Sequence, residues 1–223
     1  MNPMDDPPII IEPRDTATSA VVWLHGLGAS GDDFEPVVPY LGPVVQRTRF
    51  IFPHAPNRPV TINGGMVMRA WYDVFAMDIG RQVDEAGIIA SAALATALVQ
   101  EQIDSGIGAD RIVLAGFSQG GAIALHAGAR FPQALAGIMG LSTYLAIDCF
   151  DSPNELSANQ ETEIFLAHGL YDPVLPLQLA EQSRAKLEAN GYQVRWSTYP
   201  MEHSVSPEQL ADIANWLGAV LPS

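Results

Sequence analysis

Gly116-Phe117-Ser118-Gln119-Gly120 is the stretch with the clearest structural meaning in this chain, because a strand-like run precedes it and a helix-like run follows it. Residues 111–115 read Arg-Ile-Val-Leu-Ala, which is typical of a short buried parallel strand. Residues 121–127 read Gly-Ala-Ile-Ala-Leu-His-Ala, which has the composition of a helix start. A G-x-S-x-G pattern in this setting predicts a nucleophile elbow, whose glycines permit a tight turn and whose serine is strained. The alternative is a glycine-rich turn with a solvated serine, and only the other motifs of the chain can distinguish the two interpretations.

The composition indicates a globular protein with one domain over residues 1–223. Hydrophobic residues make up 48% of the chain and charged residues 16%, and the length is sufficient for a large core. The net charge of −14 would repel a phosphate backbone, so we expect no nucleic-acid partner. The sequence has no Lys/Arg cluster to hold an anionic membrane surface. We expect a monomer or a weak homodimer.

The chain carries a single cysteine, Cys149, so it forms no intrachain disulfide, as is usual in a reducing compartment. The first residues are acidic and lack the basic and apolar regions of a secretory signal. The longest apolar stretch, residues 88–99, is broken by Ser91 and Thr96 and is too short to span a bilayer. We therefore expect a cytoplasmic protein with no stable membrane anchor.

Strand-like and helix-like runs alternate along the chain. We expect strands at residues 8–12, 20–24, 49–52, 112–115, 135–140, 163–167 and 193–199. We expect helices at residues 33–41, 83–103, 120–130, 177–189 and 207–220. Such alternation requires crossover connections, which predict an α/β fold with a mostly parallel sheet and helices on both faces. Ligands of such sheets bind at the carboxyl ends of the strands.

A serine nucleophile needs an adjacent base, and in this kind of fold the chain order is serine, acid, histidine. The chain has five histidines, namely His25, His54, His126, His168 and His203. His25 and His54 precede Ser118. His126 lies along the helix that follows Ser118, and His168 ends a strand. His203 lies in the loop between the last expected strand and the last expected helix, so we predict that His203 is the base.

The acid that orients the base should lie between Ser118 and His203 at a strand end. Asp172 follows the strand expected at 163–167 and precedes a proline, so it fits both this role and a simple turn. Asp148 and Asp151 compete, but they follow an earlier strand. We predict that Asp172 is the acid.

Negative charge on a tetrahedral intermediate requires hydrogen-bond donors that are already in place. One predicted donor is the backbone N–H of Gln119, at the head of the helix after the elbow. The second is the N–H of Leu27 in His25-Gly26-Leu27-Gly28, which follows the strand expected at 20–24. This glycine loop lacks the spacing and the lysine of a phosphate-binding loop.

These residues together resemble the acyl-protein thioesterase and carboxylesterase family of α/β-hydrolases, also called the phospholipase/carboxylesterase family. The motifs that carry the resemblance are Leu24-His25-Gly26-Leu27-Gly28, Pro53-His54-Ala55-Pro56 with Pro59-Val60-Thr61, Trp71-Tyr72-Asp73, Gly116-Phe117-Ser118-Gln119-Gly120-Gly121, His168-Gly169, Asp172-Pro173-Val174-Leu175-Pro176 and His203-Ser204. The resemblance implies an α/β-hydrolase fold, a triad of Ser118, Asp172 and His203, oxyanion donors at Leu27 and Gln119, and no metal or organic cofactor. The chain departs from the family at Ala29, where Asp is frequent, and at Leu170 and Tyr171, where many members have small polar residues.

The long segment 61–80 is rich in methionine and aromatic residues, which suit an adaptable pocket for an acyl group. We expect Met66 and Trp71 to contact the substrate. No insertion after the strand at 135–140 is large enough for a cap domain, so the site should be open. The sequence predicts a serine carboxylesterase of carboxylic esters and, as an extension, of thioesters. The alternatives are a lysophospholipase or acyl-protein thioesterase, and a hydrolase-fold binding protein without catalysis.

Overall fold

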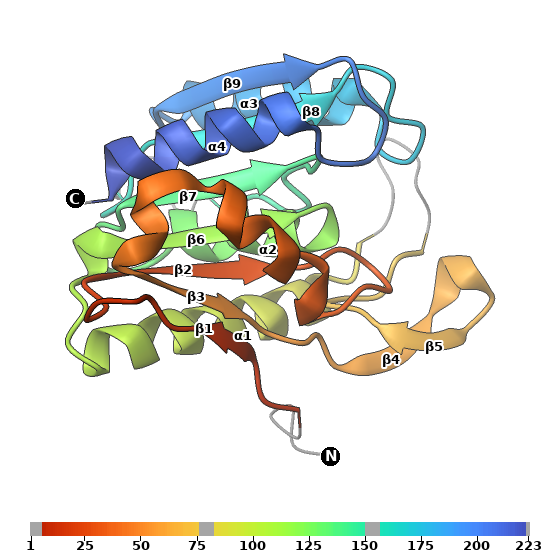
Figure 1. Ribbon diagram of the computed structural model, residues 1–223. Helices are drawn as coiled ribbons and strands as arrows, with labels where there is room; N and C mark the ends of the chain where they lie inside the picture. The colour runs from red at the N-terminus through yellow and green to blue at the C-terminus, as the bar shows by residue number, and fades with distance from the viewer. Residues whose placement is uncertain (1–5, 76–82, 150–156, 222–223) are drawn as a thin grey trace.

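A computed structural model of the chain describes residues 6–75, 83–149 and 157–221. Its centre is a seven-stranded sheet in the order β1-β3-β2-β6-β7-β8-β9 (Figure 1). The strands are β1 (Ile9–Ile11), β2 (Ser19–Leu24), β3 (Thr48–Phe52), β6 (Ile112–Phe117), β7 (Gly137–Leu141), β8 (Ile164–Gly169) and β9 (Val194–Tyr199). Every neighbouring pair is parallel except β1 and β3, so the predicted mostly parallel sheet is confirmed.

Helices cover both faces of the sheet because successive side chains of each strand point to opposite sides. In β2, Ala20, Val22 and Leu24 join one core, whereas Val21 and Trp23 join the other. Helices α1 (Glu85–Asp104), α2 (Gln119–Ala129) and α3 (Leu177–Ala189) lie on the first face, and α4 (Pro207–Val220) lies on the second (Figure 1). The predicted helices on both faces are therefore confirmed.

Helix α1 is longer than the apolar stretch that we read from the sequence. It begins after Asp84, whose side chain caps the helix by accepting a hydrogen bond from Gly87 N–H at 2.9 Å. By length and hydropathy alone, this 20-residue helix could cross a membrane, although its apolar stretch at residues 88–99 is shorter. A core helix passes the same test, and 44% of the apolar window is buried inside the molecule. The length of α1 is thus no argument for a membrane span.

The helix expected at residues 33–41 is wrong, because this segment forms short 3₁₀ helices. They are η1 (Gly31–Asp33), η2 (Glu35–Tyr40) and, beyond the expected range, η3 (Gly42–Gln46). Pro39 lies inside η2 and lacks the N–H that an α-helix would need there. Proline thus breaks a segment whose composition otherwise suits a helix.

A hairpin begins just before the methionine- and aromatic-rich segment 61–80 and includes its first part. Strands β4 (Asn57–Val60) and β5 (Met66–Arg69) pair antiparallel across a turn in which Gly64 and Gly65 have positive φ. Strand β4 is difficult to predict from the sequence, because it contains Pro59 and proline in sheets is confined to edge strands or bulges. The hairpin lies beyond the carboxyl ends of the central strands, where a ligand of such a sheet would bind (Figure 1).

Candidate active site

Ser118 stands at a tight turn between β6 and α2, with φ 53° and ψ −118°. Its N–H donates to Leu141 O at 2.8 Å, and its carbonyl accepts from Thr143 Oγ1 at 2.6 Å. A Cβ atom on Gly116 would collide with the backbone of Gly120, so the turn requires glycine there. The structure therefore has the strand, the strained serine and the helix that the sequence pattern predicts.

A continuous hydrogen-bond chain joins Ser118, His203 and Asp172. His203 Nε2 lies 2.9 Å from Ser118 Oγ, and His203 Nδ1 lies 2.6 Å from Asp172 Oδ2. An ionised carboxylate only accepts hydrogen bonds, so Nδ1 donates to Asp172 and Nε2 is left to accept the hydroxyl hydrogen of Ser118. This is the arrangement that a serine nucleophile with a general base requires.

Asp172 is shaped for the ionised state. Burial would raise the pKa of this carboxyl, but the hydrogen bonds from His203, Leu175 N–H and Val174 N–H outweigh burial and hold the pKa below its usual value. Oδ1 accepts both backbone N–H groups at 2.8 Å, which leaves Oδ2 for His203. The side chain of Asp172 is 0% exposed, so its charge is screened less by solvent than a surface charge would be.

Backbone hydrogen bonds join the loops that carry the acid and the base, beyond the ends of β8 and β9. Leu170 N–H donates to Tyr199 O at 2.8 Å, and Tyr171 N–H donates to Met201 O at 3.1 Å. These bonds extend the parallel ladder of the two strands into the loops. The distance between the carboxylate and the imidazole is therefore set by the backbone of the sheet.

The His203 ring is also held from the elbow and from the last helix. The ring of Phe117 packs against it with 4.9 Å between centroids. Behind the loop, Ser206 caps α4, and its Oγ accepts from Gln209 N–H at 3.2 Å. The side chain of His203 is 15% exposed, so the imidazole is ordered and still reaches solvent.

His25 orients the loop that contains Leu27. Its Nε2 accepts from Ala55 N–H at 3.0 Å, so Nδ1 carries the proton and donates to Gly26 O at 2.7 Å. Burial lowers the pKa of His25 to about 4, so the ring is neutral at pH 7. Because C=O and N–H of a trans peptide point in opposite directions, the N–H of Leu27 points away from this bond. A Cβ on Gly26 would lie 3.5 Å from Ser118 Cβ, which places the loop beside the serine.

The side chain of Gln119 is anchored in the core, which leaves its backbone N–H at the head of α2. Its Oε1 accepts from Trp71 N–H at 2.8 Å, and its Nε2 donates to Tyr72 O at 2.7 Å. Three of the residues that surround the elbow, His25, Trp71 and Gln119, are therefore linked. Sequence reasoning missed this network, because its partners lie 46 or more residues apart.

Trp71 does not fit its expected role of contacting the substrate. The side chain is 1% exposed, and its indole N–H donates to His25 O at 2.8 Å. Trp71 therefore supports the loop that carries Leu27 and has no free face for a ligand. Met66, the other expected contact, lies on β5 of the hairpin and is 64% exposed.

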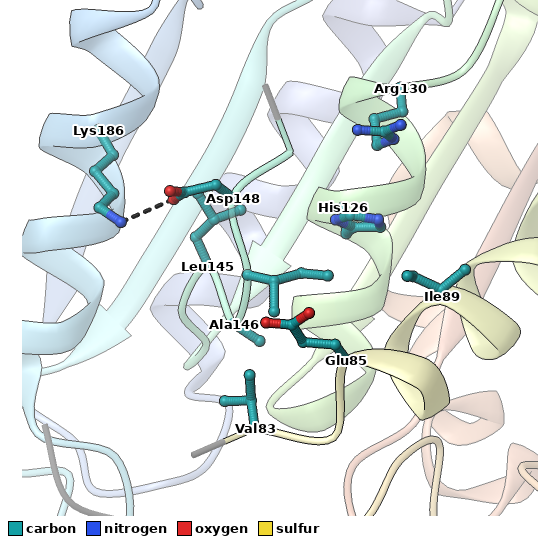
Figure 2. Close-up of a pocket in the computed structure, with 10 residues that line it drawn as sticks. Val83, Glu85, Ile89, His126, Arg130, Leu145, Ala146, Asp148 and Lys186 are labelled. Atoms are coloured by element: carbon teal, nitrogen blue, oxygen red, sulfur yellow. Dashed lines mark hydrogen bonds and ion pairs between the residues drawn. The ribbon is translucent and has the colours of Figure 1, made fainter. Parts of the chain in front are cut away.

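A separate cleft of about 600 Å³ lies on the face of the sheet that α1, α2 and α3 cover (Figure 2). His126 lines it from α2, so this histidine belongs to a different part of the molecule from the triad. Asp148, the rival acid, also lines it and pairs with Lys186 Nζ at 2.8 Å. Asp151 lies outside the described residues. Within the described ranges, no group of three His, Cys, Asp or Glu residues is placed to hold a metal ion.

The family model described as Phospholipase/Carboxylesterase matches residues 5–221. The chain belongs to the phospholipase/carboxylesterase family. Acyl-protein thioesterase 1 of Neurospora crassa is 42% identical to this family member over 226 residues, which cover 97% of this chain and 92% of that protein. Acyl-protein thioesterase 1 of Gibberella zeae is 36% identical, with 96% of each chain covered.

The fold agrees with this membership. The crystal structure of acyl-protein thioesterase 2 of Zea mays matches with a TM-score of 0.84 and 30% identity, over 96% of this chain and 99% of that chain. The predicted α/β-hydrolase fold and the predicted family are thus confirmed. This phospholipase/carboxylesterase family member is a serine hydrolase that acts on esters or thioesters.

Proposed function

We propose that the protein is a serine carboxylesterase that cleaves carboxylic esters, and also thioesters, through an acyl-enzyme on Ser118. The observation that carries this proposal is the hydrogen-bond chain from Ser118 Oγ through His203 to the buried Asp172 carboxylate. A solvated serine in a glycine-rich turn would have neither the base nor the acid within reach. We propose that the enzyme is cytoplasmic, in keeping with its single cysteine and its acidic composition.

In the proposed mechanism, Ser118 Oγ attacks the carbonyl carbon of the ester while His203 Nε2 takes the hydroxyl proton. The N–H groups of Leu27 and Gln119 stabilise the negative charge on the carbonyl oxygen. His203 then returns the proton to the leaving oxygen or sulfur, which departs and leaves the acyl group on Ser118. Water repeats the sequence and releases the acid. Asp172 stays ionised throughout and stabilises the imidazolium.

The leaving group distinguishes the candidate substrates. The two fungal relatives are named acyl-protein thioesterases, which favours thioesters as well as oxygen esters. A lysophospholipase is the alternative within the same mechanism. We propose that Met66 contacts the substrate, because its exposed side chain lies on the hairpin beyond the carboxyl ends of the strands. Rates on matched oxygen and sulfur esters of one acyl chain would rank these options.

Labelling with a fluorophosphonate tests the nucleophile, because this reagent reacts only with an activated serine. We expect the wild type to be labelled, and Ser118→Ala to be unlabelled and slower in kcat by roughly a thousandfold or more. Ser142→Ala is the matched control, since Ser142 is buried beside the elbow and its Oγ has no hydrogen-bond partner among the described residues. If Ser118→Ala kept more than a few per cent of the activity, a different nucleophile would be responsible. An unlabelled and inactive wild type would indicate a non-catalytic binding protein.

A further inference from the structure

His168 is a buried histidine that the proposed mechanism does not use. We propose that it is a positioning residue for Asp172: it holds the turn 172–175 so that the carboxylate faces His203, and it leaves the carboxylate charge to His203 by staying neutral. This inference rests on the proposed function, because it assigns a second histidine to the acid of the proposed triad.

The contacts of His168 converge on the turn that carries the acid. His168 is the second-last residue of β8 and is 0% exposed. Its Nε2 lies 2.9 Å from Leu175 O, and this carbonyl only accepts, so Nε2 carries the proton and donates. The N–H of the same Leu175 donates to Asp172 Oδ1 at 2.8 Å. Leu175 is thus held on both sides, by His168 through its carbonyl and by Asp172 through its N–H.

The same nitrogen also faces the carboxylate. His168 Nε2 lies 3.4 Å from Asp172 Oδ2, which is the oxygen that accepts from His203 Nδ1 at 2.6 Å. The carboxylate therefore lies between two imidazoles. One of them carries an N–H that is directed at the neighbouring carbonyl, so the positive end of this N–H dipole is beside Oδ2 without competing for its hydrogen bond.

The environment of His168 keeps it neutral. With the proton on Nε2, Nδ1 is unprotonated, and among the described residues this buried atom has no hydrogen-bond partner. Protonating Nδ1 would bury a donor that lacks an acceptor. The charged groups that face the ring are Asp172, Glu181 and, when protonated, His203. Burial outweighs the hydrogen bond to Leu175 O and the two carboxylates, and it lowers the pKa of His168.

Neutrality separates the two histidines in function. A protonated His168 would neutralise the charge of Asp172 and remove the counter-charge that His203 needs when it accepts the proton of Ser118. His203 Nε2 lies 2.9 Å from Ser118 Oγ, whereas His168 is 0% exposed and directs its N–H at Leu175 O, so the proton of Ser118 passes to His203. The buried imidazole therefore fixes the carboxylate while the more exposed imidazole cycles.

The test compares three variants by the pH profile of kcat/KM on an activated ester such as a p-nitrophenyl ester. His168→Leu removes the donor, His168→Asn has an amide too short to reach Leu175 O, and His168→Gln places an amide N–H near the position of Nε2. We expect kcat to fall roughly 10- to 100-fold in the Leu and Asn variants, the size of loss seen when the hydrogen-bond partner behind a metal-ligating side chain is removed. Their acid limb should move to lower pH, because a displaced carboxylate supports an imidazolium less well. In the Gln variant, both kcat and the pH of the acid limb should return towards the wild-type values.

A purely structural role gives a different result. Loss of packing alone would reduce the stability, and it would leave the acid limb of the surviving activity where the wild type has it. His126→Leu is the matched control, since it replaces another buried histidine that lies outside the acid turn; we expect its acid limb to be unchanged. An acid limb in His168→Leu that stays at the wild-type pH or moves to higher pH would overturn the proposal. If the Leu variant does not fold, an equal acid limb in the Asn and Gln variants would overturn it.

Failure of this inference is distinguishable from failure of the proposed function. If the wild type is labelled by a fluorophosphonate and Ser118→Ala is not, the triad stands whatever the His168 variants show. If the wild type is not labelled, the proposed function fails first. Labelling of the His168 variants at several pH values would give the same limb without dependence on substrate binding.

Discussion

Ser118 and Ser142 are the two non-glycine residues with positive φ in the described part of the chain, at 53° and 44°. Ser118 follows β6 and Ser142 follows β7, which are neighbours in the sheet. The N–H of each donates to the last part of the next strand, at Leu141 and Ala167. The adjacent strands therefore hold both residues in this conformation, and at Ser118 the strain belongs to the turn that presents the nucleophile.

Asp172 offers a sharp residue-scale prediction, since its role depends on accepting from His203 Nδ1. Asp172→Asn keeps the size but presents an amide that can stabilise the wrong tautomer. We expect kcat to fall by roughly 10³–10⁴ with the fold intact. Asp148→Asn is the control, because Asp148 is exposed and pairs with Lys186 away from the triad; it should stay near wild type. Steady-state kinetics on one activated ester checks both, and the opposite ranking would place the acid at Asp148.

At the residue scale, the sequence predicts the candidate catalytic side chains better than it predicts the residues that hold them in place. The order serine, acid, histidine and the strand-end positions of Ser118, Asp172 and His203 are visible in the sequence, and the structure brings these side chains together. Their roles as catalytic residues, and those of Leu27 and Gln119, stay predictions until the variants are measured. The buried Trp71 shows the limit: composition indicates a ligand contact, whereas a hydrogen bond to His25 directs the ring inward.

Close approach of α2 to the loop after β2 gives an element-scale prediction. A Cβ on Gly120 would lie 2.5 Å from the carbonyl oxygens of Leu24 and His25, so Gly120→Ala must displace backbone. We expect a loss of about 2–3 kcal/mol in the free energy of unfolding.

Gly218→Ala is the matched control for this loss, because Gly218 lies in α4 and a Cβ there meets nothing within 4 Å. We expect it to stabilise the protein by about 0.5–1 kcal/mol, since alanine has less backbone freedom to lose in a helix. Urea unfolding of both variants measures the difference. Equal changes in both would mean that α2 can move away from the loop freely.

Periodic elements were predictable, and irregular ones were not. The helices at 177–189 and 207–220 have the bounds that the sequence predicts, and the Ser206 cap marks the start of the second. The 3₁₀ segments and the hairpin of β4 and β5 were not predicted from the sequence, because Pro39 and Pro59 interrupt the local patterns. Their conformation depends on the neighbouring core more than on local propensity.

On the scale of the whole molecule, the proposed mechanism needs no Lewis acid. We expect dialysis against a chelator to leave kcat and KM unchanged, because His203 and the two proposed oxyanion donors supply the proton transfer and the charge stabilisation. Rates measured before dialysis, after dialysis and after addition of zinc or manganese check this. A lasting loss that either metal restores would require a different mechanism. The organisation of residues 1–223 as one domain likewise stays a prediction, testable by a single cooperative unfolding transition.

The acid stability of the whole molecule should depend on His25. Burial lowers its pKa to about 4 in the folded protein, whereas an unfolded histidine titrates near ~6.5. Below ~6.5 the unfolded chain takes up a proton that the folded state refuses, so this stabilisation is complete above ~6.5 and is lost as the pH falls towards 4. A difference of this size corresponds to about 3 kcal/mol.

His25→Asn tests this contribution, because an amide keeps a donor near the Nδ1 position and does not titrate. Urea unfolding at several pH values between 7 and 4 gives the stability of wild type and variant. We expect the advantage of the wild type to shrink by about 3 kcal/mol across this range. Trp71→Phe is the control: it removes the indole donor to His25 O and keeps the imidazole, so its pH dependence should match the wild type. A constant difference between wild type and His25→Asn would mean that His25 takes up a proton as readily in the folded protein as in the unfolded chain. In that case the hydrogen bond from Ala55 N–H to His25 Nε2 would have to break on acidification.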